Sequence, residues 1–254
     1  MHTSPSLKSL IELKISEKIP TAFQRKKISK SYFSRTGIEE IDSFLDGIPY
    51  GEFTQITGET SCGSTTLVLS FLAEITQNQQ LGAFVDPSNS LDIKSCSTVG
   101  INLNQLLWVR CGQKEQKLWE KLEQALKVTD LLLHNRGFGA VVLDLRGLPI
   151  NFPQRIPPAT WFRFSQTVRG SETALVLLSR KPYSKSAASL VLDCHYLEDQ
   201  WTKTGQKTEE VRISTFNGLD FGVNLLRRQP KKNFPPSNIS KFPSETIRWK
   251  TRFS

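Results

Sequence analysis

Residues 58–66 of this 254-residue chain read Gly-Glu-Thr-Ser-Cys-Gly-Ser-Thr-Thr. The spacing of Gly58, Gly63 and Thr65 is that of a phosphate loop, G-x-x-x-x-G-K-[ST]. In such a loop backbone N–H groups surround the phosphates, the Lys contacts them and the hydroxyl residue holds Mg²⁺. Ser64 stands where the Lys would be. Either the match is accidental, or the chain has the fold of a nucleotide-hydrolysing enzyme without its chemistry.

The sequence on either side of this loop has the pattern that a phosphate loop requires. Residues 52–57 predict a strand and residues 65–77 a helix. Asp144 lies in the apolar strand expected at 139–145, where a carboxylate would hold Mg²⁺. The expected residual nucleotide site is therefore Gly58, Glu59, Thr60, Ser61, Cys62, Gly63, Ser64, Thr65, Thr66 and Asp144. The alternative is that the glycines only turn a strand into a helix.

Strands and helices alternate along most of the chain. Further strands are expected at 81–86, 106–110, 139–145 and 173–179, and helices at 37–45, 114–134 and 159–169. This alternation predicts an α/β fold, a mostly parallel sheet with helices on both faces. Beyond residue 188 the pattern changes to strands in series, at 189–198, 208–216 and 220–226, with a turn at Asn217-Gly218. We therefore expect antiparallel strands at the C-terminal side of the sheet.

The composition divides the chain into three parts, an N-terminal helix with a basic linker (1–35), the α/β core (36–228) and a basic flexible tail (229–254). Apolar residues recur at helical spacing over 6–19, and this helix packs either on the core or on a partner. The tail combines prolines, basic residues and isolated aromatics, which is typical of segments that are disordered when free.

Positive charge is concentrated at the two ends. The net charge is +9, and residues 1–36 and 220–254 each carry +6, so the segment between them is slightly acidic. Basic ends suit nucleic-acid phosphates or acidic protein surfaces, or serve solubility alone. No apolar run reaches the ~18 residues of a membrane span, and the four separated cysteines fit neither a zinc site nor a disulfide framework. We expect a cytoplasmic, nucleoid-associated protein with no membrane contact and no bound metal.

Residues 36–67, TGIEEIDSFLDGIPYGEFTQITGETSCGSTTL, resemble the opening of a RecA-type recombinase core. That family runs T-G-x-x-x-[IL]-D, a turn, G-x-[IL]-T-[EQ]-I-x-G and then the phosphate loop. The resemblance covers roughly residues 36–195 and implies a RecA-like fold. It continues through Phe84-Val85-Asp86, Leu91-Asp92, Val99-Gly100-Ile101-Asn102, Leu106-Leu107 and the strand that includes Asp144.

The departures from this family concern the groups that act on a γ-phosphate. The family has a Glu two residues after the second-strand Asp, and this chain has Ser88 after Asp86. The family has an Asn-Gln pair that senses the γ-phosphate, and this chain has Ser179-Arg180. Losing one preorganised group typically costs ~10²–10³-fold in rate. Together with the missing Lys at position 64, three groups that act on a γ-phosphate are absent. We therefore expect no catalytic residues, no ATPase activity and at most residual Mg·ATP binding.

Degenerate RecA-like chains of this length resemble the ImuA family of bacterial mutagenesis accessory proteins. That resemblance implies a non-catalytic adaptor in DNA repair and SOS-induced translesion synthesis, a pseudo-ATPase whose partners are a Y-family-like polymerase subunit, a RecA-type recombinase, or both, with DNA as a further candidate. One alternative is a DNA-stimulated ATPase or recombinase completed in trans by a neighbouring subunit. Another is a DNA-binding module that uses only its basic ends.

RecA-type proteins hold DNA with two loops, which correspond to residues 146–158 and 180–188 of this chain. Basic residues of these loops would meet phosphates and a tyrosine would stack on a base, or the loops are only solvated. The end of the core and the tail add further candidates for contact with a partner or with DNA. The expected contacts are Arg146, Arg155, Arg180, Lys181, Tyr183, Lys185, Arg227, Arg228, Lys231, Lys232 and Trp249.

Overall fold

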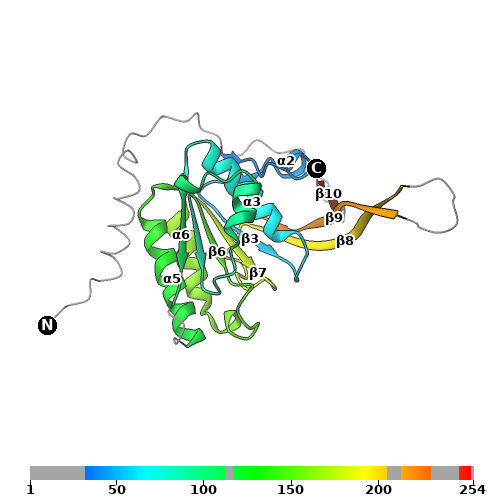
Figure 1. The fold of residues 1–254 in the computed structure, drawn as a ribbon. Helices are drawn as coiled ribbons and strands as arrows, with labels where there is room; N and C mark the ends of the chain where they lie inside the picture. The colour runs from blue at the N-terminus through cyan, green and yellow to red at the C-terminus, as the bar shows by residue number, and fades with distance from the viewer. Residues whose placement is uncertain (1–31, 113–116, 205–212, 230–245, 253–254) are drawn as a thin grey trace.

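A computed structural model describes residues 32–112, 117–204, 213–229 and 246–252. Its main sheet has eight strands in the order β10-β9-β8-β3-β7-β6-β4-β5 (Figure 1). The strands are β3 (Phe53–Thr57), β4 (Leu81–Asp86), β5 (Leu106–Arg110), β6 (Phe138–Asp144), β7 (Ala174–Ser179), β8 (Leu190–Thr204), β9 (Ile213–Arg228) and β10 (Ile247–Arg252). Strands β3, β4, β5, β6 and β7 run parallel to one another, and β8 pairs parallel with β3. The pairs β8–β9 and β9–β10 are antiparallel. The α/β prediction of a mostly parallel sheet with antiparallel strands at the C-terminal side is confirmed.

Helices cover both faces of the sheet. One face carries α2 (Glu39–Leu45), α3 (Ser64–Gln77) and α4 (Ile93–Thr98), and the other carries α5 (Leu118–His134) and α6 (Pro158–Val168) (Figure 1). Short 3₁₀ turns lie at η1 (Leu103–Gln105) and η2 (Pro153–Arg155), and β1 (Phe33–Ser34) pairs with β2 (Ile48–Pro49) in a separate antiparallel sheet. Among the described residues, no helix has the length and apolarity needed to cross a bilayer.

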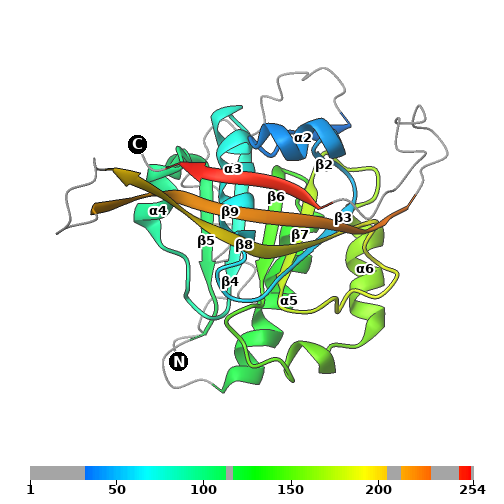
Figure 2. The ribbon, with the colours of Figure 1, turned by 90° about the vertical axis from the view of Figure 1, so that its right-hand side faces the viewer.

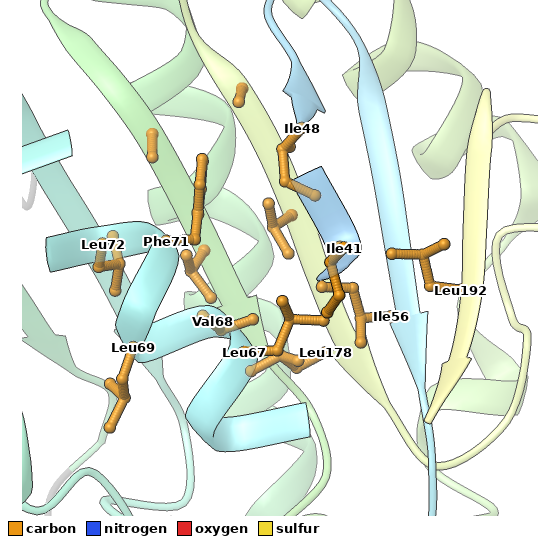
Figure 3. Packing of buried hydrophobic residues seen from close by; sticks show 14 of the residues in the cluster. Ile41, Ile48, Ile56, Leu67, Val68, Leu69, Phe71, Leu72, Leu178 and Leu192 are labelled. Atoms are coloured by element: carbon orange, nitrogen blue, oxygen red, sulfur yellow. The ribbon is translucent and has the colours of Figure 1, made fainter. Parts of the chain in front are cut away.

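The core consists of two apolar layers, one on each face of the sheet. Because side chains alternate along a strand, Val142 of β6 faces α3 while Val141 faces α5. Figure 3 shows Leu67 of α3 close to Ile56 and Leu178 of the sheet, with Ile41 of α2 beside them. Strands β4, β6 and β7 are buried on both faces and read as nearly continuous apolar runs, and for this reason the sequence predicted their bounds to within a residue.

The C-terminal strands differ from the prediction in number and extent. The three strands expected at 189–198, 208–216 and 220–226 are two long strands, β8 and β9. The turn expected at Asn217-Gly218 is wrong, because β9 continues through it with a bulge. Gly218 pairs with Gln200 and Phe216 with Trp201, which leaves Asn217 as the extra residue.

The expectation of a flexible tail over 229–254 is wrong for its last described segment. Residues 247–252 form β10, which pairs with β9 and extends the sheet (Figure 2). The physical reason is the burial of Trp249, whose side chain is 2% exposed and belongs to the core. The core therefore includes a segment beyond residue 228. The helix and linker predicted within 1–31 lie outside the described residues, as do Lys231 and Lys232.

Candidate nucleotide site

The loop 58–66 joins the end of β3 to the start of α3, as the sequence predicted. The Gly58 N–H donates a hydrogen bond to the Ser179 carbonyl at the end of β7, at 3.2 Å. Glu59, Thr60 and Ser61 are exposed, and the chain enters α3 through Gly63, whose φ is +82°. The N-cap residue of α3 is Gly63, which has no side chain to cap the helix. The backbone thus has the strand–loop–helix arrangement on which a phosphate loop is built.

The two glycines of the loop are required by packing. A Cβ at Gly58 would lie 2.3 Å from Cys62 Sγ, and one at Gly63 would lie 2.6 Å from Cγ of Phe221 and 2.8 Å from Cζ2 of Trp249. The last two side chains come from β9 and β10, and their ring centroids are 4.8 Å apart. The glycine spacing that marks the motif is therefore sufficiently explained by contacts inside the protein.

Asp144 ends β6 and forms an ion pair with Arg146, two residues later. Arg146 Nε donates to Asp144 Oδ1 at 3.0 Å and Nη2 to Oδ2 at 2.6 Å. The third nitrogen, Nη1, donates to Ser64 Oγ at 2.9 Å and to Thr65 Oγ1 at 2.7 Å. Asp144 is 2% exposed, so this is a buried, bidentate pair. The guanidinium joins the end of β6 to the start of α3.

Asp86, the last residue of β4, is fully buried and organises the turn that follows the strand. It accepts hydrogen bonds from the backbone N–H groups of Ser88, Ser90 and Leu91 at 2.7–3.1 Å, and from Trp108 Nε1 at 3.3 Å. The Ser88 hydroxyl also donates to Asp86, at 3.2 Å. Ser88 lies against Gly147, where an added Cβ would be 2.3 Å from Ser88 Oγ. Position 88 is therefore a packed turn position.

Ser179, at the end of β7, belongs to a buried hydrogen-bond network. Gln55 Nε2 donates to Ser179 Oγ at 2.7 Å, and Ser179 Oγ donates to the Lys181 carbonyl at 2.9 Å. The Gln55 side-chain carbonyl accepts hydrogen bonds from both the backbone and the hydroxyl of Ser184. The network fixes residues 179–184 to β3. Sequence reasoning missed Gln55, although a glutamine in a strand predicted next to the phosphate loop is a candidate for a buried polar contact.

These contacts decide whether Mg·ATP fits the residues present. The carboxylate that would hold Mg²⁺ is paired with Arg146, and the hydroxyls of Ser64 and Thr65 face the same guanidinium. In the described part of the chain, no group of three or more His, Cys, Asp and Glu side chains is arranged to hold a metal ion. A metal–nucleotide complex of the usual kind does not fit this arrangement.

The structure brings the two expected DNA-contact loops together. The Tyr183 hydroxyl of the second loop donates to the Ile150 carbonyl of the first at 3.1 Å. Tyr183 is half-buried by this contact, so the expected free stacking residue is a bridge between the loops. Arg146 is held by Asp144 with its side chain 19% exposed, and its contact with DNA or a partner stays a prediction. The side chains of Arg155, Arg180, Lys181 and Lys185 are exposed, and their contact with DNA or a partner stays a prediction.

The expected contacts at the C-terminal side also take part in internal packing. Arg227 donates to the Lys185 carbonyl, and Arg228 lies 3.8 Å from Asp46 and over the ring of Phe33. Burial lowers the pKa of both guanidinium groups. Trp249 is buried against Phe221, which corrects its assignment as a contact for a partner or DNA.

The chain is similar in sequence to RecA proteins. The family model of the RecA N-terminal domain matches residues 23–147. The RecA of Pseudomonas putida is 34% identical over 100 residues, which are 39% of this chain and 26% of that protein. The RecA of Borrelia hermsii is 33% identical over 117 residues, 42% of this chain and 31% of that protein. The chain thus spans between a quarter and a third of these relatives. The matches support a RecA-like family, and the fold is a RecA-like α/β fold.

Proposed function

We propose that this chain is a non-catalytic RecA-fold adaptor in DNA repair and damage-induced mutagenesis, of the kind that the ImuA family provides in translesion synthesis. One observation carries the non-catalytic part. The three positions that would act on a γ-phosphate are Ser64, Ser88 and Ser179, and each hydroxyl is engaged in hydrogen bonds within the protein. Position 64 lacks the Lys, position 88 the carboxylate and position 179 the amide of a RecA-type site. The three serines instead make hydrogen bonds that hold the fold together.

The magnitude of the loss supports an absence of turnover. Phosphoryl transfer depends on positioning and on electrostatic stabilisation, and the removal of one preorganised group costs about 10²–10³-fold in rate. The hydroxyls of Ser88 and Ser179 are themselves engaged in hydrogen bonds within the protein, to Asp86, Gln55 and the Lys181 carbonyl. A chain with all three positions altered would hydrolyse ATP at a rate close to that of the uncatalysed reaction.

The similarity to RecA supports a role in the repair or recombination of DNA. RecA-like proteins bind DNA and other proteins, and we propose the same two classes of partner here. The protein partner would be a Y-family-like polymerase subunit, a RecA-type recombinase, or both. The exposed basic residues Arg155, Arg180, Lys181 and Lys185 supply a surface for DNA or for an acidic partner. We place the protein in the cytoplasm with the nucleoid.

The first test is phosphate release from Mg·ATP by the purified chain, with and without single-stranded DNA, against a RecA protein as positive control. We expect no release above background from wild type or from Ser64→Lys. The Lys side chain would meet the Arg146 guanidinium, which is 2.9 Å from Ser64 Oγ, and position 88 would still lack a carboxylate. DNA-stimulated release by wild type would refute the proposal and favour an ATPase completed in trans. Appreciable release by Ser64→Lys alone would refute the argument about position 88.

The second test concerns the partner. The chain is mixed with the RecA protein, and separately with the Y-family-like polymerase subunit, of the same organism, and each mixture is analysed by size-exclusion chromatography. We expect co-elution with at least one of them, with and without ATP. Failure to bind either protein, together with tight binding to DNA that weakens steeply with salt, would replace the adaptor by a DNA-binding module.

A further inference from the structure

The Arg146 guanidinium contacts a set of ligands that suits a metal ion. A Mg²⁺ ion in a phosphate-loop site is held by a hydroxyl at the start of the helix and by a carboxylate at the end of a neighbouring strand. Here the same two kinds of ligand, Ser64 and Thr65 on α3 and Asp144 on β6, all contact one guanidinium at 2.6–3.0 Å. The positive charge comes from the chain itself.

The backbone around Arg146 holds the side chain in this position. Leu145 and Leu148 are both 2% exposed, and the Leu145 N–H donates to the Leu178 carbonyl of β7 at 2.9 Å. Gly147 packs against Ser88, where its missing Cβ allows an approach that any other residue would prevent. The serine at position 88, in place of a longer carboxylate, thus leaves room for the turn that directs Arg146 toward Asp144.

The electrostatics of the site favour a single, permanent cation. An arginine guanidinium keeps its positive charge in proteins, and Arg146 lies 2.6 Å from the Asp144 carboxylate. The N-terminus of α3 carries a partial positive charge that disfavours any cation near it. The negative charge of Asp144 and the oxygen atoms of Ser64 and Thr65 offset this repulsion for the Arg146 guanidinium, which contacts all three. A divalent cation added beside Arg146 would find the charge of the buried Asp144 carboxylate already neutralised.

We infer that the Arg146 guanidinium is a built-in substitute for the metal ion of a nucleotide site, which joins the loop 58–66 to the end of β6 without a ligand and closes a latent divalent-cation site. This inference deepens the proposed function and rests on it, because a site that cannot bind a metal ion cannot hydrolyse ATP in the usual way. The loop is thereby held in one arrangement whether nucleotide is present or not. An adaptor built in this way would bind its partner independently of nucleotide.

The experiment uses Mn²⁺ as the probe and the full-length chain, with bound and free Mn²⁺ distinguished by electron paramagnetic resonance. Arg146→Gln removes the charge, Arg146→Lys keeps it, and Asp144→Asn combined with Arg146→Gln removes the carboxylate as well. We expect Arg146→Gln to bind one Mn²⁺ per chain at least about tenfold more tightly than wild type, and the double variant to lose this gain. The Lys variant should behave like wild type. Circular dichroism establishes that each variant is folded.

Two results would overturn the inference. The first is Mn²⁺ binding by folded Arg146→Gln that is no tighter than binding by wild type. The second is strong binding by wild type that disappears in Asp144→Asn. If the Gln variant does not fold, hydrogen exchange of wild type gives the answer: the amides of residues 58–66 should exchange at the same rates with Mg·ATP and with a chelator. A marked slowing by Mg·ATP would contradict a closed site. These outcomes are independent of partner binding, so the adaptor proposal and this inference can fail separately.

Discussion

Trp249 offers the sharpest test of how the C-terminal strand supports the loop. Its side chain is 2% exposed, packs on Phe221 with ring centroids 4.8 Å apart and a tilt of 37°, and reaches Gly63. Its indole N–H has no hydrogen-bond partner among the described residues. Trp249→Ala should therefore lower the free energy of unfolding by about 3–5 kcal/mol through the lost contacts and the cavity. Trp249→Phe should change it by less than about 1 kcal/mol, because removing an unpaired buried N–H offsets part of the lost packing.

The assay is urea unfolding followed by circular dichroism. For a chain of this size the Ala variant should shift the midpoint by about 1–2 M, whereas the Phe variant should leave it nearly unchanged. Phe162→Ala is the matched control: Phe162 is 43% exposed on α6, and its truncation should cost less than about 1 kcal/mol. An Ala variant of Trp249 no less stable than the Phe162 control would refute the view that β10 belongs to the core. It would restore the tail as a free segment available to a partner.

Two further predictions follow from the same structure. Gly63→Ala should lower the free energy of unfolding by about 2–5 kcal/mol, because its Cβ would clash with Phe221 and Trp249. Gly170, with a φ of +70° and nothing within 4 Å of an added Cβ, is the control: Gly170→Ala should lower it only by the backbone strain of about 1–2 kcal/mol. Equal urea midpoints for the two variants would contradict the packing role of Gly63. Burial, with a smaller contribution from the charge of Asp86, raises the pKa of the Cys111 thiol from 9.0 to about 12. The neutral thiol therefore stabilises the fold fully below pH 9. This contribution to the free energy of unfolding is lost between pH 9 and 12, because the thiol ionises in the unfolded chain first. Urea unfolding of wild type and Cys111→Ala at successive pH values should show a steeper alkaline loss for wild type, and parallel curves would contradict the assignment.

The parallel half of the sheet was predictable because its strands follow a strong local rule. Strands β4 and β5 have the predicted bounds, and β3, β6 and β7 differ by one residue. For β4, β6 and β7 the reason is that strands buried on both faces are nearly continuous apolar runs. The strand–loop–helix context of residues 58–66 was predictable for the same reason. The position of Asp144 at a strand end was also correct, because it is the first charged residue after that run.

The contacts made by the site were not predictable, because they join residues with no local relation. Nothing in the sequence indicates that Arg146 turns back to Asp144 and spans to Ser64, 82 positions away. Phe221 and Trp249, which pack on Gly63, are still farther from it in the sequence. The segment that contains Trp249 is basic and rich in proline, a composition typical of disordered tails. The extent of β9 was missed because Asn217-Gly218 is a common turn sequence, and here a bulge accommodates it.

The order of strands in the sheet has a consequence for how the chain folds. Strand β3, which carries the loop 58–66, has β7 and β8 as its neighbours, and residue 54 of β3 pairs with residues 176 and 190. The segment that matches the RecA N-terminal domain ends at residue 147, before either neighbour. During synthesis, more than a hundred residues must therefore be added after β3 before either of its partner strands exists. Pairing strands so far apart in the sequence requires the closure of a long loop, which is slow and costs entropy. A fragment ending at residue 147 would hold the recognisable motif on a strand without partners. The loop would be among the last parts of the molecule to acquire its native shape.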